Sequence, residues 1–414
     1  MPTLRRPGKR VWLGAAGLVL VLLIAGGVLA LGLVRGWFDP GSVEGTTEGF
    51  EPAEAPRGAA AAGSWPEYGF DSRRTRANPA LRLRPPYARR WSLDAGSLLE
   101  FPPVLGDGRA VVGTNAGLGL AVDLETGRRL WRVPLRGRVA SSPGLAGDLA
   151  LFTTVRGDVI ALRAATGDPV WRRRVGSAVE SSPLVVDGSL YLGTLAGRVL
   201  SLDVRTGGVR WSARAAGDVK ASLALSGPNV VVGDYAGVVT AFRRSDGRVA
   251  WRRESPGEPL RGAGRFYAGP AVAYGRVYVG NVNGRVLALD EDDGEVAWVR
   301  VLDDFVYSSA AVSERTVVVG SYDRRVHALD AVTGRPRWSF DAGERISGSP
   351  SVIGDLVYAS TIARDPRDGR TVALDLATGR RVWTFPDGRY SPAVAVRGLL
   401  VITGVRTLYG LAPR

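Results

Sequence analysis

The sequence predicts an all-β protein: an eight-bladed β-propeller of four-stranded antiparallel blades, preceded by a single transmembrane helix. Three observations lead to this prediction. A tryptophan recurs about every 40 residues, each repeat carries four strand-like runs, and an uncharged stretch near the N-terminus is long enough to cross a bilayer.

The tryptophans define the repeat, because eight of them follow one another at separations of 40, 40, 40, 40, 47, 40 and 45 residues. Seven end the phrase Ala-x-Asp-x-x-Thr-Gly-x-x-x-Trp, first at residues 121–131 and last at residues 373–383, with small departures in the middle copies. We expect each indole to be buried where two blades meet, a burial worth about 5 kcal/mol as an upper bound. These structural tryptophans are Trp91, Trp131, Trp171, Trp211, Trp251, Trp298, Trp338 and Trp383.

The runs inside a repeat are short and rich in β-branched or aromatic residues. In the third repeat they are residues 183–186, 190–192, 199–202 and 209–211, separated by turns such as Asp187-Gly188. Strands that follow one another through such short turns pair antiparallel, which argues against a TIM barrel or a Rossmann sheet. No helix-length apolar period occurs within the array, so a propeller is favoured over a helical solenoid.

The two ends of the array predict how the ring closes. The last repeat starts near Ser391-Pro392 and stops after Leu411, before its fourth strand. The strand around Trp91 precedes any other strand of its own repeat. We therefore predict that this N-terminal strand pairs into the last blade, which gives eight blades and leaves no open sheet edge.

On these phrases, residues 87 to 414 resemble the PQQ-like (pyrroloquinoline-quinone-like) β-propeller repeat family. The segment Trp65–Asp71, with Arg74-Thr75, is similar to the lead-in that precedes such propellers in membrane-anchored or exported bacterial proteins. That family includes quinoprotein dehydrogenases, ectodomains of sensor kinases, and the propeller component of the outer-membrane β-barrel assembly machinery. The resemblance implies the fold and leaves the function open.

The N-terminal region divides by composition. Residues 1–10 are basic and are predicted to be a cytoplasmic tail, and residues 11–34 lack charged side chains and are predicted to be an uncleaved transmembrane signal anchor. Residues 35–63 are predicted to be a flexible linker, and residues 64–86 a lead-in strap packed on the propeller of residues 87–414. We expect a single-pass protein of the cell membrane whose propeller lies outside the cytoplasm.

Composition excludes several chemistries. The chain has no cysteine and one histidine, His327, so thiolate zinc sites, lipidation at cysteine and histidine-based triads are absent. The acidic run 290–295 lacks the spacing of a calcium loop, and no phosphate-binding loop or nucleic-acid motif is present. Quinoprotein dehydrogenases commonly use an adjacent cysteine pair and a calcium-ligating acidic set, and the sequence shows neither. We predict no catalytic residue, no metal and no cofactor.

Comparing the repeats with one another points to a candidate site. Four residues before the aligned proline of each innermost strand, the repeats keep a large apolar residue, which we expect to be buried. The next residue should face the channel, and there the repeats differ. These channel-mouth residues are Glu100, Ala140, Glu180, Lys220, Tyr267, Tyr307, Ser347 and Arg389.

The turns between second and third strands should reach the same rim. In repeats four to six they bring Asp234, Tyr235, Asn281, Asn283, Ser321, Tyr322 and Asp323. The two insertions of the array, near residues 256–265 and 363–368, fall on the same face, as binding-face insertions often do. The pattern predicts a ligand or partner site centred on blades four to six, and it also fits a channel mouth that is only solvated.

Three function classes follow. The first, which we favour, is a monomeric, non-catalytic scaffold or ligand-sensing module that binds a protein, a small molecule or a polysaccharide at the channel mouth. The second is a PQQ-dependent quinoprotein dehydrogenase. The third is a binder of anionic cell-wall polymer, which the net charge of +14 would favour.

Overall fold

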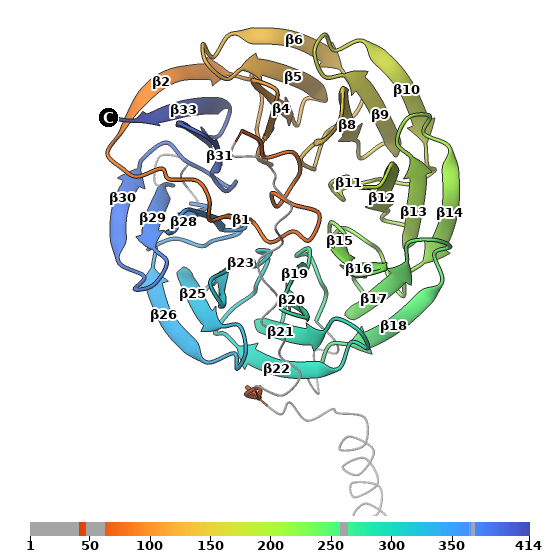
Figure 1. Cartoon of the computed structure of the whole chain (residues 1–414), viewed down its shortest axis with the longest axis vertical. Coiled ribbons are helices and arrows are strands. Elements are labelled where there is room, and N and C mark those ends of the chain that lie inside the picture. The colour runs from red at the N-terminus through yellow and green to blue at the C-terminus, as the bar shows by residue number, and fades with distance from the viewer. Residues whose placement is uncertain (1–40, 47–62, 257–263, 364, 366–368) are drawn as a thin grey trace, which may run out of the picture. The chain divides into compact units, whose positions relative to one another are not determined.

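The computed structural model of the chain describes residues 41–46, 63–256, 264–363, 365 and 369–414. Within these residues the regular elements are all β-strands, and they form eight sheets arranged as the blades of a ring (Figure 1). The predicted eight-bladed all-β propeller is confirmed.

The first four blades each contain four consecutive strands, numbered outward from the centre of the ring. Blade 1 consists of β3 (Val104–Gly106), β4 (Arg109–Gly113), β5 (Leu118–Asp123) and β6 (Arg129–Pro134). Blade 2 consists of β7 (Gly144–Ala146), β8 (Leu149–Thr153), β9 (Asp158–Arg163) and β10 (Pro169–Arg174). Blade 3 consists of β11 (Leu184–Val186), β12 (Ser189–Gly193), β13 (Arg198–Asp203) and β14 (Val209–Arg214). Blade 4 consists of β15 (Ala224–Ser226), β16 (Asn229–Gly233), β17 (Val238–Arg243) and β18 (Val249–Glu254).

The next three blades repeat this order, and blade 7 gains a short parallel strand, β1, at its inner edge. Blade 5 consists of β19 (Ala271–Ala273), β20 (Arg276–Gly280), β21 (Arg285–Asp290) and β22 (Val296–Val301). Blade 6 consists of β23 (Ala311–Ser313), β24 (Thr316–Gly320), β25 (Arg325–Asp330) and β26 (Pro336–Asp341). Blade 7 consists of β1 (Ala77–Asn78), β27 (Ser351–Ile353), β28 (Leu356–Ser360), β29 (Thr371–Asp375) and β30 (Arg381–Phe385).

Blade 8 closes the ring with strands from both ends of the propeller, as the sequence predicts. Its inner strands are β31 (Val394–Val396), β32 (Leu399–Thr403) and β33 (Thr407–Pro413), and its outer strand is β2 (Tyr87–Asp94). β2 pairs antiparallel with β33 from Tyr87 opposite Pro413 to Asp94 opposite Thr407. The outer strand of this blade is therefore held by pairing between residues more than 300 positions apart in the chain.

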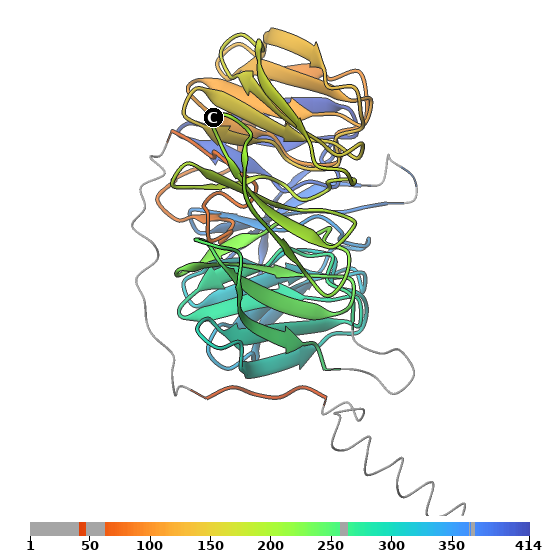
Figure 2. The same cartoon turned by 90° about the vertical axis from the view of Figure 1, so that its right-hand side faces the viewer.

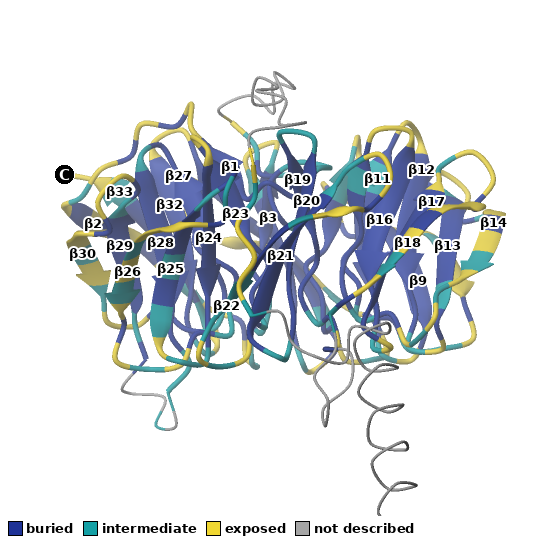
Figure 3. Cartoon of the chain, turned by 90° about the horizontal axis from the view of Figure 1, so that it is seen from below, coloured by how far each residue is buried: buried dark blue, intermediate teal, exposed yellow. Residues whose placement is uncertain are grey.

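The core lies between neighbouring blades. The second and third strands of a blade are buried almost throughout, whereas the outermost strand alternates and buries chiefly its tryptophan (Figure 3). In β18, for example, Trp251 is buried while Ala250 and Arg252 on either side are exposed. This alternation is the period of two expected for a strand with one solvated face.

Each tryptophan from Trp91 to Trp338 is bonded to the next blade. The indole Nε1 of Trp211 donates to the carbonyl oxygen of Arg244 at 2.8 Å, and the other six make the same bond at 2.8 to 3.1 Å. The ring of Trp211 also covers Gly247, the glycine of the repeat phrase in blade 4. A β-carbon on Gly247 would lie 2.6 Å from that ring, and the residue has a φ of +74°. The repeat phrase therefore contains both partners of the contact between blades, which are the tryptophan of one blade and the glycine of the next.

Trp383 is the exception, because blade 8 has no Thr-Gly turn to receive it. Its ring meets Tyr87 of β2 edge-on, with centroids 5.0 Å apart. The Tyr87 hydroxyl lies 2.6 Å from that of Tyr358 in blade 7. The closing strand thus takes the place of the missing turn.

The strap, residues 64–86, lies across one end of the channel (Figure 1). The innermost strands leave backbone N–H groups directed at the channel, and a buried donor without an acceptor is costly. Strap carbonyls accept these bonds at 2.7 to 2.8 Å in six blades. The donors are Leu105, Leu145, Leu225, Val272, Val312 and Val352, and the acceptors are Trp65, Pro66, Ser72, Arg73, Thr75 and Arg76.

The strap also buries charged side chains. Arg74 is fully buried, and it donates to the carbonyls of Leu223 at 3.0 Å and Pro183 at 2.8 Å. Its Nη1 lies 3.1 Å from Glu67 Oε2, and the Glu67 carboxylate also accepts a bond from the N–H of Val185 in blade 3. Burial raises the pKa of Glu67 to about 7, since the loss of hydration outweighs the attraction of Arg74.

Some predicted features fall outside the described residues. These are the tail 1–10, the membrane span 11–34, and most of the two insertions, at residues 257–263, 364 and 366–368. Among the residues that the structure does describe, none belongs to a helix long and apolar enough to cross a membrane. Residues 41–46 of the predicted linker lie against blade 5.

Deleting residues 85–95 should lower the melting temperature markedly, because it removes β2 and leaves blade 8 with three strands and an unpaired β33 edge. Thermal unfolding of this variant should be compared with that of a control variant that lacks residues 1–40 and keeps β2. An unchanged melting temperature after the internal deletion would refute closure by β2.

Replacing Trp211 by alanine should destabilise the propeller by about 3 to 5 kcal/mol, since it empties the contact between blades 3 and 4. Val209→Ala in the same strand is the control, because Val209 is 50% exposed and should cost little. Chemical denaturation measures both. Equal effects of the two substitutions would contradict a structural role for the indole.

The buried Glu67 predicts a pH dependence of stability. Its pKa is about 7 in the folded chain and about 4.5 when unfolded, so its contribution to stability is present below pH 4.5 and is lost as the pH rises to 7. The glutamine of Glu67→Gln does not titrate. The free energy of unfolding of this variant, measured relative to that of the wild type, should therefore rise by about 3 kcal/mol over this interval. Denaturation of both proteins from pH 4.5 to 8 checks this, and a constant difference would refute it.

Candidate functional site: the channel mouth

The channel is open at the end opposite the strap, where it forms a cavity of about 210 Å³. Tyr68 of the strap reaches its floor, where the Tyr68 hydroxyl lies 3.1 Å from Ser349 Oγ. Six of the predicted channel-facing residues line the cavity, namely Glu100, Glu180, Lys220, Tyr267, Tyr307 and Ser347. The side chains meet there because every innermost strand starts at this end of the ring.

A chain of charges occupies the side formed by blades 1 to 4. Arg138 lies between Glu100 at 3.5 Å and Glu180 at 3.3 Å, and Glu180 also pairs with Lys220 at 2.8 Å. Arg138 was not predicted, because it precedes the buried Val139 at a position that the repeats fill with unrelated residues. The pairs are half exposed, so they contribute little to stability and mainly fix the positions of the side chains.

Aromatic side chains occupy the side formed by blades 4 to 6. We call this group the aromatic arc: Tyr235, Tyr267, Tyr307, Tyr322 and Phe305. Successive tyrosine rings are in contact, with centroids 4.6, 4.8 and 4.7 Å apart. Phe305 packs 5.8 Å from Tyr307 yet is 38% exposed. Phe305 has one signal in the sequence, because it is an aromatic residue in a polar loop directly before the buried Val306.

Three cations border the aromatic arc. Lys220 lies 5.2 Å from the centroid of Tyr267, and the guanidinium groups of Arg265 and Arg345 lie 6.0 and 5.4 Å from Tyr235 and Tyr322. These are cation–π distances, and such contacts are weak at exposed sites. The arc therefore presents apolar ring surface with positive charge along its rim.

Two tyrosines of the arc, Tyr235 and Tyr307, stay neutral at physiological pH. Burial and a hydrogen bond with Tyr267 raise the pKa of Tyr235, and burial together with the neighbouring tyrosines raises the pKa of Tyr307. Their hydroxyl groups can therefore both donate and accept hydrogen bonds to a bound partner.

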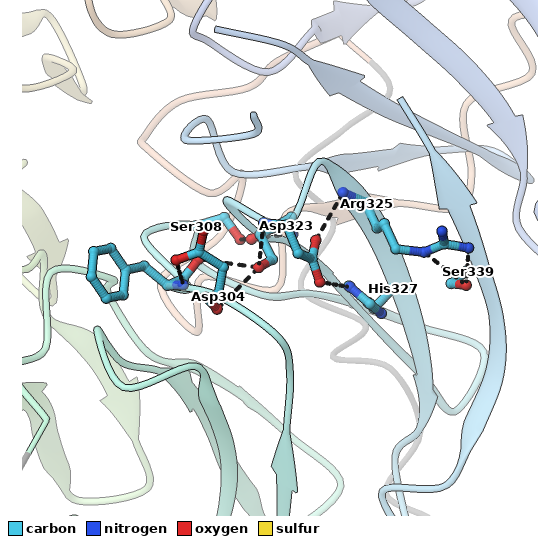
Figure 4. Close-up of polar contacts among 9 residues, drawn as sticks. Asp304, Ser308, Asp323, Arg325, His327 and Ser339 are labelled. Atoms are coloured by element: carbon cyan, nitrogen blue, oxygen red, sulfur yellow. Dashed lines mark hydrogen bonds and ion pairs between the residues drawn. The ribbon is translucent and has the colours of Figure 1, made fainter. Parts of the chain in front are cut away.

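Asp323 follows Tyr322 in the same turn and makes polar contacts with Arg325 and His327 (Figure 4). Its Oδ2 lies 2.7 Å from His327 Nε2, and its Oδ1 accepts the N–H of Arg325 at 2.9 Å. Burial alone would raise the pKa of Asp323, but the hydrogen bond and charge of His327 outweigh it and lower the pKa. In the same turn, Ser321 Oγ donates to the carbonyls of Asp304 and Phe305, which ties the turn of Tyr322 to the loop of Phe305.

Two other predicted rim residues hold turns together. Asp234 is fully buried, and its carboxylate accepts backbone N–H bonds from Ala216, Gly217, Ala236 and Val238. Asn281 is also fully buried, and its amide accepts from Asn283 and Arg285. A polar residue at these turns satisfies backbone donors and is not displayed to a ligand. Asn283 is half-buried in the same turn.

Arg389 was placed one residue out of register. It is buried, its N–H donates to Thr403, and its guanidinium donates to the carbonyls of Pro386, Gly388 and Gly369. Tyr390 lines the cavity instead, with a φ of +55°. Blade 8 therefore enters its inner strand one residue later than the repeat spacing predicts.

A family model described as "Outer membrane protein assembly factor BamB" matches residues 86–221, 115–259, 196–305 and 304–409. The chain belongs to this family. The resemblance to PQQ-like propellers expected from the repeat phrase is confirmed. No curated protein matches the sequence significantly.

Among solved structures, this BamB-family chain is similar to BamB from Moraxella catarrhalis, with a TM-score of 0.68 and 18% identity over 79% of this chain and 100% of that one. It is also similar to the quinohemoprotein alcohol dehydrogenase ADHIIG from Pseudomonas putida HK5, with a TM-score of 0.73 and 13% identity over 85% of this chain and 80% of that one. The enzyme from Comamonas testosteroni has a TM-score of 0.72 and 16% identity over 86% of this chain and 81% of that one. At these identities the likeness shows the fold alone.

The residues of the mouth do not fit a quinone cofactor with its metal. Pyrroloquinoline quinone is a tricarboxylate, whereas the cavity presents Glu100 and Glu180, and Lys220 is already paired with Glu180. Within the described part of the chain, His, Asp and Glu side chains nowhere gather in a group of three able to hold a metal ion. The acidic run 290–295 is an ordinary turn, in which Glu291 pairs with Arg73 of the strap at 2.7 Å.

Proposed function

We propose that this BamB-family propeller is a non-catalytic scaffold of the bacterial cell envelope that binds a protein partner at its channel mouth. The observation that supports this proposal best is the difference between the two ends of the channel. The strap closes one end with buried charges and backbone hydrogen bonds, and the other end displays the aromatic arc with its basic rim. A single face is thereby left for recognition.

The chemistry of that face suits a protein loop or peptide. Tyrosine and arginine are enriched at the centres of protein interfaces, because each combines a large contact area with hydrogen-bonding groups. The arc offers four tyrosine hydroxyls beside exposed ring surface, and the opposite side offers paired charges at fixed positions. A partner segment with apolar and acidic side chains would complement both the rings and the rim.

The predicted anchor at residues 11–34 would place this scaffold at the membrane with the propeller outside the cytoplasm. The quinoprotein alternative shares the fold, but among the described residues no three His, Asp or Glu side chains gather to hold the metal of such an enzyme. Binding of an anionic polymer rests on the net charge of +14 alone, and the two glutamates of the mouth work against it.

The triple substitution Lys220→Ala, Tyr267→Ala and Tyr307→Ala in the full chain tests the proposal. It removes the centre of the arc, and truncation of even one interface hot spot costs about 2 kcal/mol, so copurification of the partner from native membranes should be lost. Tyr274→Ala is the control, because Tyr274 belongs to blade 5 but lies in the β19–β20 turn at the strap end.

Partners retained equally by the triple variant and the control would refute the mouth as the docking surface. A stoichiometric chromophore after reconstitution with quinone and calcium would instead support the enzyme alternative. A steep fall of binding with salt and no protein partner would support an anionic polymer.

A further inference from the structure

Residues 41–46 form an additional strand-like contact on the outer edge of blade 5 (Figure 2). Val43 and Val299 of β22 exchange both backbone hydrogen bonds, at 2.8 and 2.9 Å, and the N–H of Gly45 donates to Thr333 at 3.0 Å. Ser42 Oγ accepts the N–H of Val301 at 3.0 Å. The segment thus covers part of an edge that would otherwise be unpaired.

Blade 5 differs from the other blades at this edge. Directly after its tryptophan it carries Val299, which is only 2% exposed. In the other blades the residue after the tryptophan is polar and exposed: Ser92, Arg132, Arg172, Ser212, Arg252, Ser339 and Thr384. An apolar residue at this position is therefore specific to the blade that receives the segment.

The segment also has contacts that suit this location. Glu44 pairs with Arg335 of blade 6 at 2.8 Å and lies 4.0 Å from Arg300. A β-carbon on Gly45 would come within 2.6 Å of the Val332 carbonyl oxygen and 3.1 Å of that of Ala297. Shape and charge together fix both the place and the register of residues 41–46.

The direction of the segment follows from its antiparallel pairing. Its beginning lies beside Val301, at the end of β22 that leads through Asp304 to Tyr307 at the mouth. Its end lies beside Thr333, in the turn between the third and fourth strands of blade 6, on the side of the ring that the strap covers. The chain therefore reaches the ring at the mouth side of its rim.

We propose that the outer edge of β22 is a docking site for the chain's own tether, and that it holds the mouth side of the propeller towards the membrane. This rests on the membrane span predicted at residues 11–34. With residues 41–46 docked, the chain left between span and ring is residues 35–40, which reaches at most about 20 Å. The mouth then faces membrane-bound partners, and attachment at the rim leaves it uncovered.

A cysteine pair tests the docking directly, because the chain has no cysteine of its own. Hydrogen-bonded antiparallel partners have Cα atoms about 5.5 Å apart, within the range of a disulfide. Val43→Cys with Val299→Cys in the full chain should form an intramolecular disulfide under mild oxidation. It should appear as a monomer of altered mobility on non-reducing gels.

Val43→Cys with Ser212→Cys is the matched control, because Ser212 follows the tryptophan of blade 3 and should remain reduced. Adding Gly45→Val to the first pair should reduce the yield, because the new side chain collides with the Val332 carbonyl. Equal oxidation of both pairs, or a disulfide-linked dimer, would overturn docking within one chain.

The orientation is tested with the full chain in lipid nanodiscs that carry a headgroup quencher. A fluorophore at Ala196→Cys marks the mouth side of blade 3, and one at Arg205→Cys marks the strap side of the same blade. The first should lose more fluorescence than the second, and Gly45→Val should remove the difference. Equal quenching, stronger quenching at residue 205, or no quenching at either position would overturn the proposal.

Discussion

The propeller depends on one repeated contact, in which a tryptophan of each blade covers a glycine and bonds a carbonyl of the next blade. The contact needs the indole, because the ring supplies area and its N–H supplies the donor that a buried carbonyl requires. It also needs the glycine, because any side chain at Gly247 or its counterparts would occupy the place of the ring. Seven copies bind each blade to its successor, and the eighth, Trp383, packs on the closing strand. This one interaction therefore underlies both the regular spacing of the tryptophans in the sequence and the packing of the blades in the ring.

The ring creates a second physical problem, since eight short inner strands point unpaired donors into the channel. The strap solves it at one end by presenting carbonyl groups to six blades and a carboxylate to a seventh. The channel becomes asymmetric as a result. At the other end the innermost strands begin with unlike side chains, and the charges gather on blades 1 to 4 and the aromatic rings on blades 4 to 6. This asymmetry, and not the fold itself, distinguishes the candidate site.

The repeat made the fold predictable, because eight copies allowed positions to be compared within one sequence. The blade count, the closing strand and most channel-facing residues follow from spacing alone. The errors occur where the copies differ. Arg389 lies in the irregular last blade, where the inner strand starts one residue late. Asp234 and Asn281 look like rim groups, yet their turns use them to accept backbone N–H bonds, which spacing cannot reveal. Arg138 and Phe305 lie at a position without a shared pattern. The path of the strap across the channel, and the docking of residues 41–46, depend on contacts between distant segments that periodicity does not encode.

We propose that only the open end of the channel is a recognition surface. Site-specific photocrosslinking in native membranes can decide this, with a photoreactive amino acid in place of Tyr307 at the mouth or of Tyr274 at the strap end. A discrete protein adduct is expected from position 307 and none from position 274. An adduct from position 274 alone, or the same adducts from both positions, would contradict it.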